Sequence, residues 1–181
     1  MRYSDVESYE DFQATLNKPS EEPYTTFVKG LYYTGTRESE LTRVTSEDVY
    51  WDREQPIFLN VKVHTLKNKR SKVRVIPINK EIEPQAIELF LNAKSGKLPE
   101  EPLFWDRVVK EETFLRNLRR KVNELYDGVA PHFFRHCRLT HCITRFNYSD
   151  YELMQYAGWT DVRPGSFYVH LRVQNLQAKM R

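Results

Sequence analysis

A β-hairpin pattern stands between two sets of helical patterns in this sequence. Residues 57–66 and 72–78 are rich in β-branched side chains and partly alternate apolar with polar positions, and Val49–Asp52 is a shorter run of the same kind. Lys67–Ser71 provides the turn between the two longer runs. The sequence therefore predicts a small three-stranded antiparallel sheet inside a mostly helical chain.

Helical patterns precede and follow this sheet. Ser4 followed by Glu7 resembles a capping box that opens a helix over residues 5–16, a second helix ends near Gly35, and a short helix carries Arg37–Arg43. Further helices are expected over 84–94, 110–126, 132–147 and 149–157, with another candidate at Ser166–Arg181. We therefore expect an α+β fold that is mainly α-helical with one small three-stranded antiparallel sheet.

Length and composition favour one folded domain. The chain has 181 residues with 10 Phe, 11 Tyr and 3 Trp, and no repeat or flexible linker divides it. No apolar run approaches the ~20 residues that cross a bilayer, and Met1–Glu10 is too polar and acidic for a signal peptide. We therefore expect a cytoplasmic protein with no membrane partner. Cys137 and Cys142 lie five residues apart in one predicted helix, a poor geometry for a disulfide, so we expect buried thiols.

Charge is unevenly distributed along the chain. Residues 1–24 hold two basic and six acidic groups, so that a net charge of +3 divides into −4 there and +7 over residues 25–181. The stretch Lys62–Lys80 holds seven basic residues and no acidic one: Lys62, Lys67, Lys69, Arg70, Lys72, Arg74 and Lys80. A charge run alone is most often a solvated face, but it also produces a field suited to a polyanion.

Four separated segments carry chemically capable side chains. They are Thr34–Leu41, the hairpin that ends in Arg74–Ile78, Pro131–His136, and Ala157–Trp159 followed by Phe167–His170. Taken singly each signal is weak, because an arginine after a helix-ending glycine is most often a surface residue, and a histidine and an arginine three apart are most often a helix-face pair. Their order along the chain carries more information than any one of them.

In that order the segments resemble the catalytic domain of the tyrosine recombinases, also called the phage-integrase family, from about residue 4 to the end of the chain. The family's first catalytic arginine follows Thr-Gly and precedes Ser-Glu-Leu, which matches Arg37. Its His-x-x-Arg-His box matches His132, Arg135 and His136. The resemblance implies that both arginines and His132 are catalytic, whereas Glu40 orients Arg37 or caps its helix.

The resemblance also covers the end of the sequence. A Gly-His or Gly-Trp position of the family matches Gly158-Trp159, and the nucleophile segment nine residues later matches Tyr168-Val169-His170. Tyr168 is thereby implied as the nucleophile. The indole N–H of Trp159 can donate to a phosphate oxygen but cannot exchange a proton.

The hairpin lysine of the family is matched by counting back from a proline. In the family this lysine lies eight residues before the proline of the third strand, which places it at Lys69, counted from Pro77. The hairpin lacks the glycines that often flank the family's lysine. A different turn length would give the role to Lys67 or Lys72, so these two remain alternatives.

The implied chemistry agrees with the residue types. When a phenol attacks a phosphodiester, the phosphorus becomes five-coordinate and its non-bridging oxygens carry negative charge. The planar guanidinium forks of Arg37 and Arg135 match these oxygens. His132 helps to take the proton of Tyr168, and Lys69 protonates the departing 5′ oxygen. The product is a 3′-phosphotyrosyl link that a 5′ hydroxyl reverses, so we expect no cofactor and no metal.

The resemblance implies a domain and its partners. Residues 1–181 correspond to the catalytic domain, with an acidic helical lead-in over 1–24 and without the N-terminal core-binding domain that usually precedes it. The implied partner is double-stranded DNA, bound by a homo-oligomer, a synaptic tetramer, that assembles through Leu171–Arg181. The expected role is integration, excision or resolution of mobile or circular DNA in a prokaryotic or viral setting, at the nucleoid.

Other assignments of these residues are a metal site, a metal-dependent nuclease, a topoisomerase and a DNA-binding module. His136, Cys137, His141 and Cys142 suggest a zinc cluster, and Cys137 and His141 share a helical face, but Cys142 is turned away by the ~100° advance per residue. A metal-dependent nuclease needs grouped carboxylates, which the sequence does not show. A type IB topoisomerase-like activity and a non-catalytic DNA-binding module remain alternatives, although binding alone needs no phenol at position 168.

Overall fold

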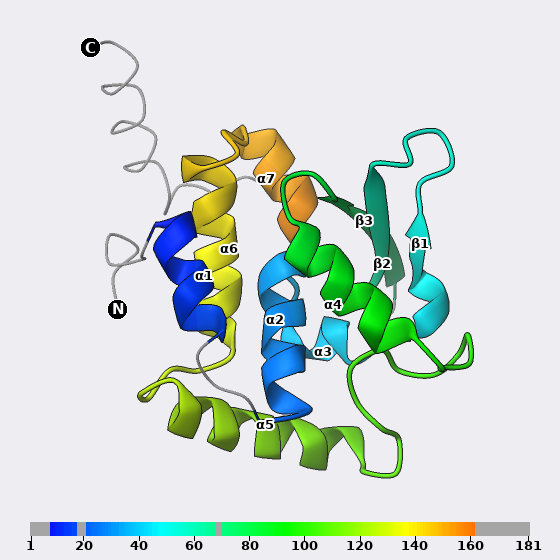
Figure 1. The fold of residues 1–181 in the computed structure, drawn as a ribbon, viewed down its shortest axis with the longest axis vertical. Coiled ribbons are helices and arrows are strands. Elements are labelled where there is room, and N and C mark those ends of the chain that lie inside the picture. Colours follow the sequence, from blue (N-terminus) through cyan, green and yellow to red (C-terminus); the bar gives the residue numbers. More distant parts are fainter. Residues whose placement is uncertain (1–7, 18–20, 68–69, 162–181) are drawn as a thin grey trace.

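Figure 1 shows the fold in a computed structural model, which describes residues 8–17, 21–67 and 70–161. The expected α+β class is confirmed, with three strands and seven α-helices among these residues. The elements in chain order are α1 (Tyr9–Asn17), α2 (Tyr24–Thr34), α3 (Glu38–Leu41), the 3-10 helix η2 (Ser46–Asp48), β1 (Val49–Trp51), β2 (Phe58–Lys67), β3 (Arg70–Asn79), α4 (Pro84–Lys94), α5 (Glu111–Leu125), α6 (His132–Thr144) and α7 (Asp150–Ala157). The predicted tail helix, Ser166–Arg181, lies outside the described residues.

The sheet has the strand order β1-β2-β3 with both pairs antiparallel, as predicted. Pairing of β2 with β3 continues to Lys67 opposite Arg70. The predicted five-residue turn, Lys67–Ser71, is therefore wrong, because only positions 68 and 69 lie between the strands. Backbone pairing does not require apolar side chains, so the ladder extends into polar residues that a hydrophobicity pattern assigns to the turn.

The two faces of β3 differ in exposure. Ile76 and Ile78 are fully buried, whereas Val73 and Val75 are 51% and 46% exposed. Because side chains alternate between the faces of a strand, the next position on the inner face toward the hairpin tip is Arg74. The inner face thus changes from apolar to charged as β3 is followed back toward the turn.

Helix α2 is the central helix of the fold and contacts α3, α4, α5 and α6. Phe27, Leu31 and Tyr32 are at most 1% exposed. In Figure 1, α1 and α6 lie on one side of α2, the sheet lies on the other, and α5 crosses the end of α2 where that helix begins. The helix ends as predicted at Gly35, whose φ of 58° is left-handed and whose N–H donates to the carbonyls of Leu31 and Tyr32.

The N-terminal lead-in contributes to the core. Helix α1 begins at Tyr9 and not at residue 5, and the Ser8 hydroxyl oxygen accepts from the Asp11 N–H at 3.2 Å. The predicted capping box of Ser4 and Glu7 lies outside the described residues. Phe12 is 1% exposed, and its ring centroid lies 4.9 Å from that of Tyr32 in α2. The segment is acidic on its surface, but its apolar side is part of the main core.

Helix α6 is anchored by a buried ion pair. Arg138 donates to both carboxylate oxygens of Glu83, at 2.5 and 2.9 Å, and its Nε donates to the Tyr156 hydroxyl at 2.8 Å. These contacts join α6 to the start of α4 and to α7. Helix α6 ends at Thr144, earlier than the predicted 147, because Asn147 has a left-handed φ of 57°.

Two further observations concern membrane-spanning helices and the cysteines. None of the helices in the described ranges combines the length and the apolarity that crossing a bilayer requires. Cys137 and Cys142 are free and buried in α6, as the sequence predicts. Burial raises the pKa of the Cys142 thiol to about 12, which outweighs the lowering effect of the Arg138 charge and keeps the thiol protonated.

Candidate active site

The candidate site is organised around the carboxylate of Glu40, which is 3% exposed. Arg37 donates to Oε1 from Nη1 at 3.0 Å and to Oε2 from its backbone N–H at 2.8 Å. Arg74 donates to Oε2 from Nη2 at 2.9 Å and to Oε1 from Nη1 at 3.3 Å. A third guanidinium, that of Arg135, lies 3.8 Å from Oε2. Arginines from α6, from β3 and from the start of α3 thus share one buried carboxylate.

These charges control the ionisation of Glu40. Burial alone would raise the pKa of its carboxyl group, but the hydrogen bonds and charge of Arg74, the backbone N–H of Arg37 and the charge of Arg135 outweigh burial. The pKa is lowered to about 2. Glu40 is therefore ionised at neutral pH and cannot donate a proton. Its contacts with the side chain and the backbone N–H of Arg37 fit the expectation that it orients Arg37 or caps its helix.

Arg37 reaches the surface of this cluster. It is the N-cap residue of α3, with an extended backbone (φ −79°, ψ 157°), and it follows the turn at Gly35. Its side chain is 45% exposed although one of its nitrogen atoms is bound to Glu40. The guanidinium is thus held at one side and open to a ligand at the other.

Arg135 is almost completely enclosed, with 3% of its side chain exposed. Nη1 donates to the carbonyl oxygen of Gly35, and Nη2 donates to that of Ala157 at 2.8 Å. The same side chain therefore fixes the end of α2, the end of α7 and the carboxylate of Glu40. Sequence reasoning anticipated Arg135 as a site residue but not these bonds to backbone carbonyls.

His132 begins α6, one turn before Arg135. Its ring contacts the ring of His136 edge-on, with centroids 4.5 Å apart. Partial desolvation, together with the charges of Arg135 and Arg37, lowers the pKa of His132 below its ordinary value. Desolvation and the charges of His132 and Arg135 lower the pKa of His136 to about 4. Both rings are neutral at pH 7, and a neutral imidazole can accept a proton.

Trp159 follows the left-handed residue Gly158 (φ 70°), where α7 ends. Its backbone N–H donates to the Met154 carbonyl at 3.0 Å, and its half-buried side chain packs against the core. A Cβ at Gly158 would collide with the guanidinium of Arg74. The turn that carries Trp159 therefore lies directly against the Glu40 cluster.

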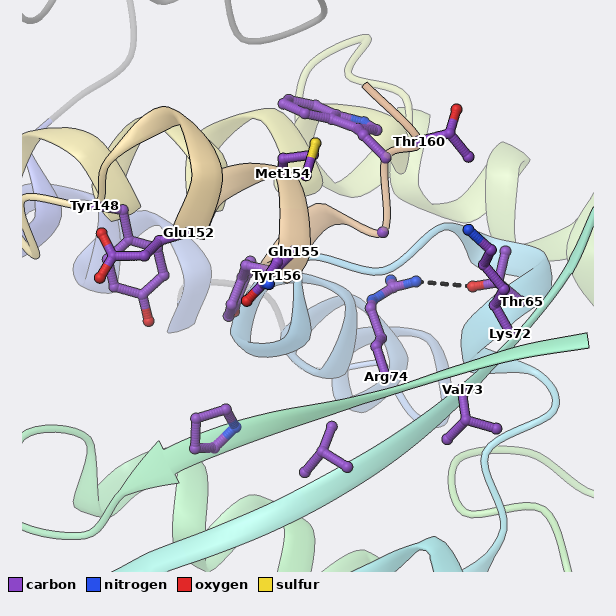
Figure 2. A pocket seen from close by; sticks show the side chains of 14 residues that line it. Thr65, Lys72, Val73, Arg74, Tyr148, Glu152, Met154, Gln155, Tyr156 and Thr160 are labelled. Carbon is purple, nitrogen blue, oxygen red and sulfur yellow. Dashed lines mark hydrogen bonds between the residues drawn. The ribbon is translucent and has the colours of Figure 1, made fainter. Parts of the chain in front are cut away.

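A groove of about 1080 Å³ opens beside this cluster, between β3 and α7. Figure 2 shows that Arg74 points from β3 across the groove toward the end of α7 and donates to Thr65. Lys72, Met154 and Trp159 also line the groove. Within the described ranges, no three His, Cys, Asp or Glu side chains are placed to hold a metal ion together.

The structure brings together some of the predicted site residues. Arg37 and Arg135 meet at Glu40, and His132 is one helical turn from Arg135. Lys69 and Tyr168 lie outside the described residues, so their roles stay predictions. Of the alternative lysines, Lys67 pairs with Arg70 at the hairpin end, and Lys72 is exposed and pairs with Thr65.

Sequence reasoning assigned no site role to Arg74 or Thr65. The sequence contains a signal for Arg74, because it occupies the same alternating face as Ile76 and Ile78, where a core residue is expected. An arginine at a core-facing strand position needs a buried partner. Thr65 carries no comparable signal, since threonine is ordinary in a strand.

Comparison with known proteins places the chain in a family. The sequence pattern of the phage integrase family matches residues 2–175. No curated protein matches the sequence. The fold is similar to a XerH site-specific recombinase bound to its difH substrate (TM-score 0.63, 13% identity, covering 100% of this chain and 53% of that one). It is also similar to a XerA recombinase (TM-score 0.63, 22% identity, 97% and 64%).

A third similar structure is the Tn1549 transposon integrase in complex with circular intermediate DNA (TM-score 0.62, 17% identity, covering 97% of this chain and 66% of that one). The chain thus spans about half to two-thirds of the length of these structures. At these identities the likeness concerns the fold, which is that of the tyrosine recombinase catalytic domains, and the match over residues 2–175 identifies the family. The chain belongs to the phage integrase family, the tyrosine recombinases.

Proposed function

We propose that residues 1–181 form the catalytic domain of a site-specific DNA recombinase or integrase, which cleaves and rejoins strands through a 3′-phosphotyrosyl intermediate. The observation that carries the proposal is the meeting of Arg37 and Arg135, far apart in sequence, at the buried carboxylate of Glu40. Neutral His132 lies one helical turn away. Family membership supports the same assignment.

The proposed roles of the arginines follow from phosphate chemistry. Attack on a phosphodiester produces a five-coordinate phosphorus with negative charge on its non-bridging oxygens, and donors held in place before the reaction are the main source of acceleration. The open side of the Arg37 guanidinium is suited to one such oxygen, and Arg135 supplies a second fixed charge. The Trp159 indole N–H adds a neutral donor.

The remaining groups take part in the proton transfers. The Tyr168 oxygen attacks phosphorus while its proton passes to His132, and the bond from phosphorus to the 5′ oxygen breaks. Lys69 protonates that oxygen, which departs as a hydroxyl. In rejoining, a 5′ hydroxyl attacks the phosphotyrosyl link and Tyr168 leaves. Because one phosphoester bond replaces another in each step, the cycle needs no ATP.

The proposal extends to partners and setting. Double-stranded DNA is the substrate, as it is in the XerH complex with difH and the Tn1549 complex with circular intermediate DNA. Copies of the chain assemble on DNA as a synaptic tetramer through Leu171–Arg181. The reaction serves integration, excision or resolution of mobile, viral or circular DNA.

The test is a denaturing gel of the protein incubated with nicked suicide duplexes that contain the host element's own recombination site. Wild-type protein is expected to give a band shifted by covalently attached DNA without added metal, and Tyr168→Phe is expected to give none. Tight binding without any adduct, even after a core-binding domain is supplied, would favour a DNA-binding module. An adduct with Tyr168→Phe would place the nucleophile elsewhere.

A further inference from the structure

Arg74 holds Glu40 through a guanidinium fork, whereas Arg37 contacts it with its backbone N–H and one side-chain nitrogen. The Arg74 guanidinium binds both carboxylate oxygens, at 2.9 and 3.3 Å, whereas the Arg37 side chain binds one. A two-point contact fixes the plane of a carboxylate as well as its position, which a one-point contact does not. The Arg74 fork on β3 is therefore the one side chain that binds both oxygens, and it fixes the plane of Glu40 together with the backbone N–H of Arg37.

Thr65 makes the arrangement more rigid. Its hydroxyl donates to Glu40 Oε1 at 2.9 Å and accepts from Arg74 Nη1 at 2.8 Å. The hydroxyl comes from β2, so both strands of the hairpin contribute to the seat of the carboxylate. Figure 2 shows the bond between Arg74 and Thr65 at the wall of the groove.

Exposure distinguishes Arg74 from Arg37. The side chain of Arg37 is 45% exposed, whereas that of Arg74 is 11% exposed with both Nη atoms bound to Glu40 or Thr65. Arg74 also lies so close to Gly158 that a methyl group there would collide with it. It therefore lies between α3 and the turn that carries Trp159, with only a small part of its surface open to the groove.

We propose that Arg74 is a positioning residue of the active site, which fixes the Glu40 carboxylate and, through it, the guanidinium of Arg37. Arg74 acts at a distance from the reacting phosphate and does not contact it. The role rests on the proposed function, because it concerns the rate of the cleavage step assigned there. It also connects the hairpin to the arginines, so that a displacement of β3 changes the placement of Arg37.

The experiment compares two substitutions of Arg74 with a matched control. Arg74→Gln removes the charge and the fork, and Arg74→Lys keeps the charge but cannot bind both oxygens in one plane. The control is Arg119→Gln, which breaks a different arginine contact of α3, the exposed bond of 2.9 Å to Glu38. Single-turnover cleavage of the nicked duplex, DNA affinity and urea denaturation are measured for each protein.

Misplacing a catalytic group slows the reaction more than it weakens binding, so the cleavage rate is expected to fall by about tenfold to a hundredfold in both Arg74 variants. The dissociation constant for DNA is expected to stay within about twofold, since Arg74 does not touch phosphate. Arg119→Gln is expected to cleave like the wild type. Adding Arg74→Gln to Arg37→Lys is expected to slow cleavage by less than about threefold, because the two residues act through one contact.

Several outcomes would overturn the inference. Wild-type cleavage by a folded Arg74→Gln protein would do so, and so would equal losses in rate and affinity, or fully additive effects with Arg37→Lys. If Arg74→Gln does not fold, the same criteria apply to Arg74→Lys. A wild type without any adduct would contradict the proposed function instead. In that case an NMR titration of Glu40 tests the positioning role of Arg74 without any cleavage. Arg74→Gln is expected to raise the pKa of Glu40 above its value of about 2, and an unchanged pKa would refute the positioning role.

Discussion

Arg135 combines a proposed catalytic role with a structural one. Its Nη atoms donate to the carbonyls of Gly35 and Ala157, so an alanine substitution would disturb the fold together with the chemistry. We therefore expect the clearest result from Arg135→Lys, which keeps a cation but loses the fork. Loss of one preorganised donor lowers such rates by about 10²- to 10³-fold. Single-turnover cleavage is expected to fall by this amount while DNA affinity changes much less, and equal losses in both would argue against transition-state stabilisation.

The contribution of Glu40 to the free energy of unfolding depends on pH, and the direction of this dependence follows from its lowered pKa. In the folded protein the pKa of Glu40 is about 2, which is below its ordinary value of about 4.5. Ionised Glu40 therefore stabilises the folded state at neutral pH, and this stabilisation is lost as pH falls from about 4.5 toward 2. The free energy of unfolding of the wild type should exceed that of Glu40→Gln by an amount that narrows by about 1 kcal/mol between pH 6 and pH 3.5. Urea denaturation of both proteins checks this, and a constant or widening difference would show that Glu40 is not held by the arginines.

Among the elements, the hairpin of β2 and β3 contains every candidate for the general acid. The strands pair as far as Lys67 and Arg70, and position 69 lies between them in the sequence. Each lysine is replaced by alanine in turn, and cleavage is measured on normal DNA and on DNA with a 5′-bridging phosphorothiolate, whose leaving group needs no proton. Lys69→Ala is expected to be slow on normal DNA and restored on the modified DNA. Restoration of Lys67→Ala or Lys72→Ala instead would assign the role to that residue.

The elements also show what a single sequence predicts well. The end of α2 and the start of α4 follow from helix-terminating and helix-starting residues. Gly35 in the left-handed region ends α2, Pro84 lies in the first turn of α4, and both positions agree with the predicted limits. The hairpin turn and the end of α6 were misplaced, because backbone pairing and a left-handed Asn147 are not visible in hydrophobic periodicity. The resemblance identified Arg37 and Arg135, but only the fold reveals that Arg74 joins them at Glu40, since that contact depends on the packing of β3 against α3.

At the scale of the whole domain, the buried pair of Arg138 and Glu83 connects α6, which carries His132 and Arg135, to α4 and α7. Removing one partner of a buried pair leaves an uncompensated charge, so Arg138→Ala is expected to lower the free energy of unfolding by about 3–5 kcal/mol. The exposed pair of Arg119 and Glu38 provides the contrast, and Arg119→Gln should cost less than about 1 kcal/mol. Urea denaturation measures both, and similar small losses would mean that Arg138 is not a buried anchor in solution.

The proposed chemistry depends on one covalent bond between Tyr168 and the 3′ phosphate of a cleaved strand. Mass spectrometry of the trypsin-digested adduct, formed from wild-type protein and a nicked duplex, locates that bond. The expected result is a nucleotide joined through its 3′ phosphate to Tyr168 in the peptide that ends at Arg172. A nucleotide on another residue, or one joined through a 5′ phosphate, would contradict the assignment of this chain's nucleophile and the polarity of its cleavage.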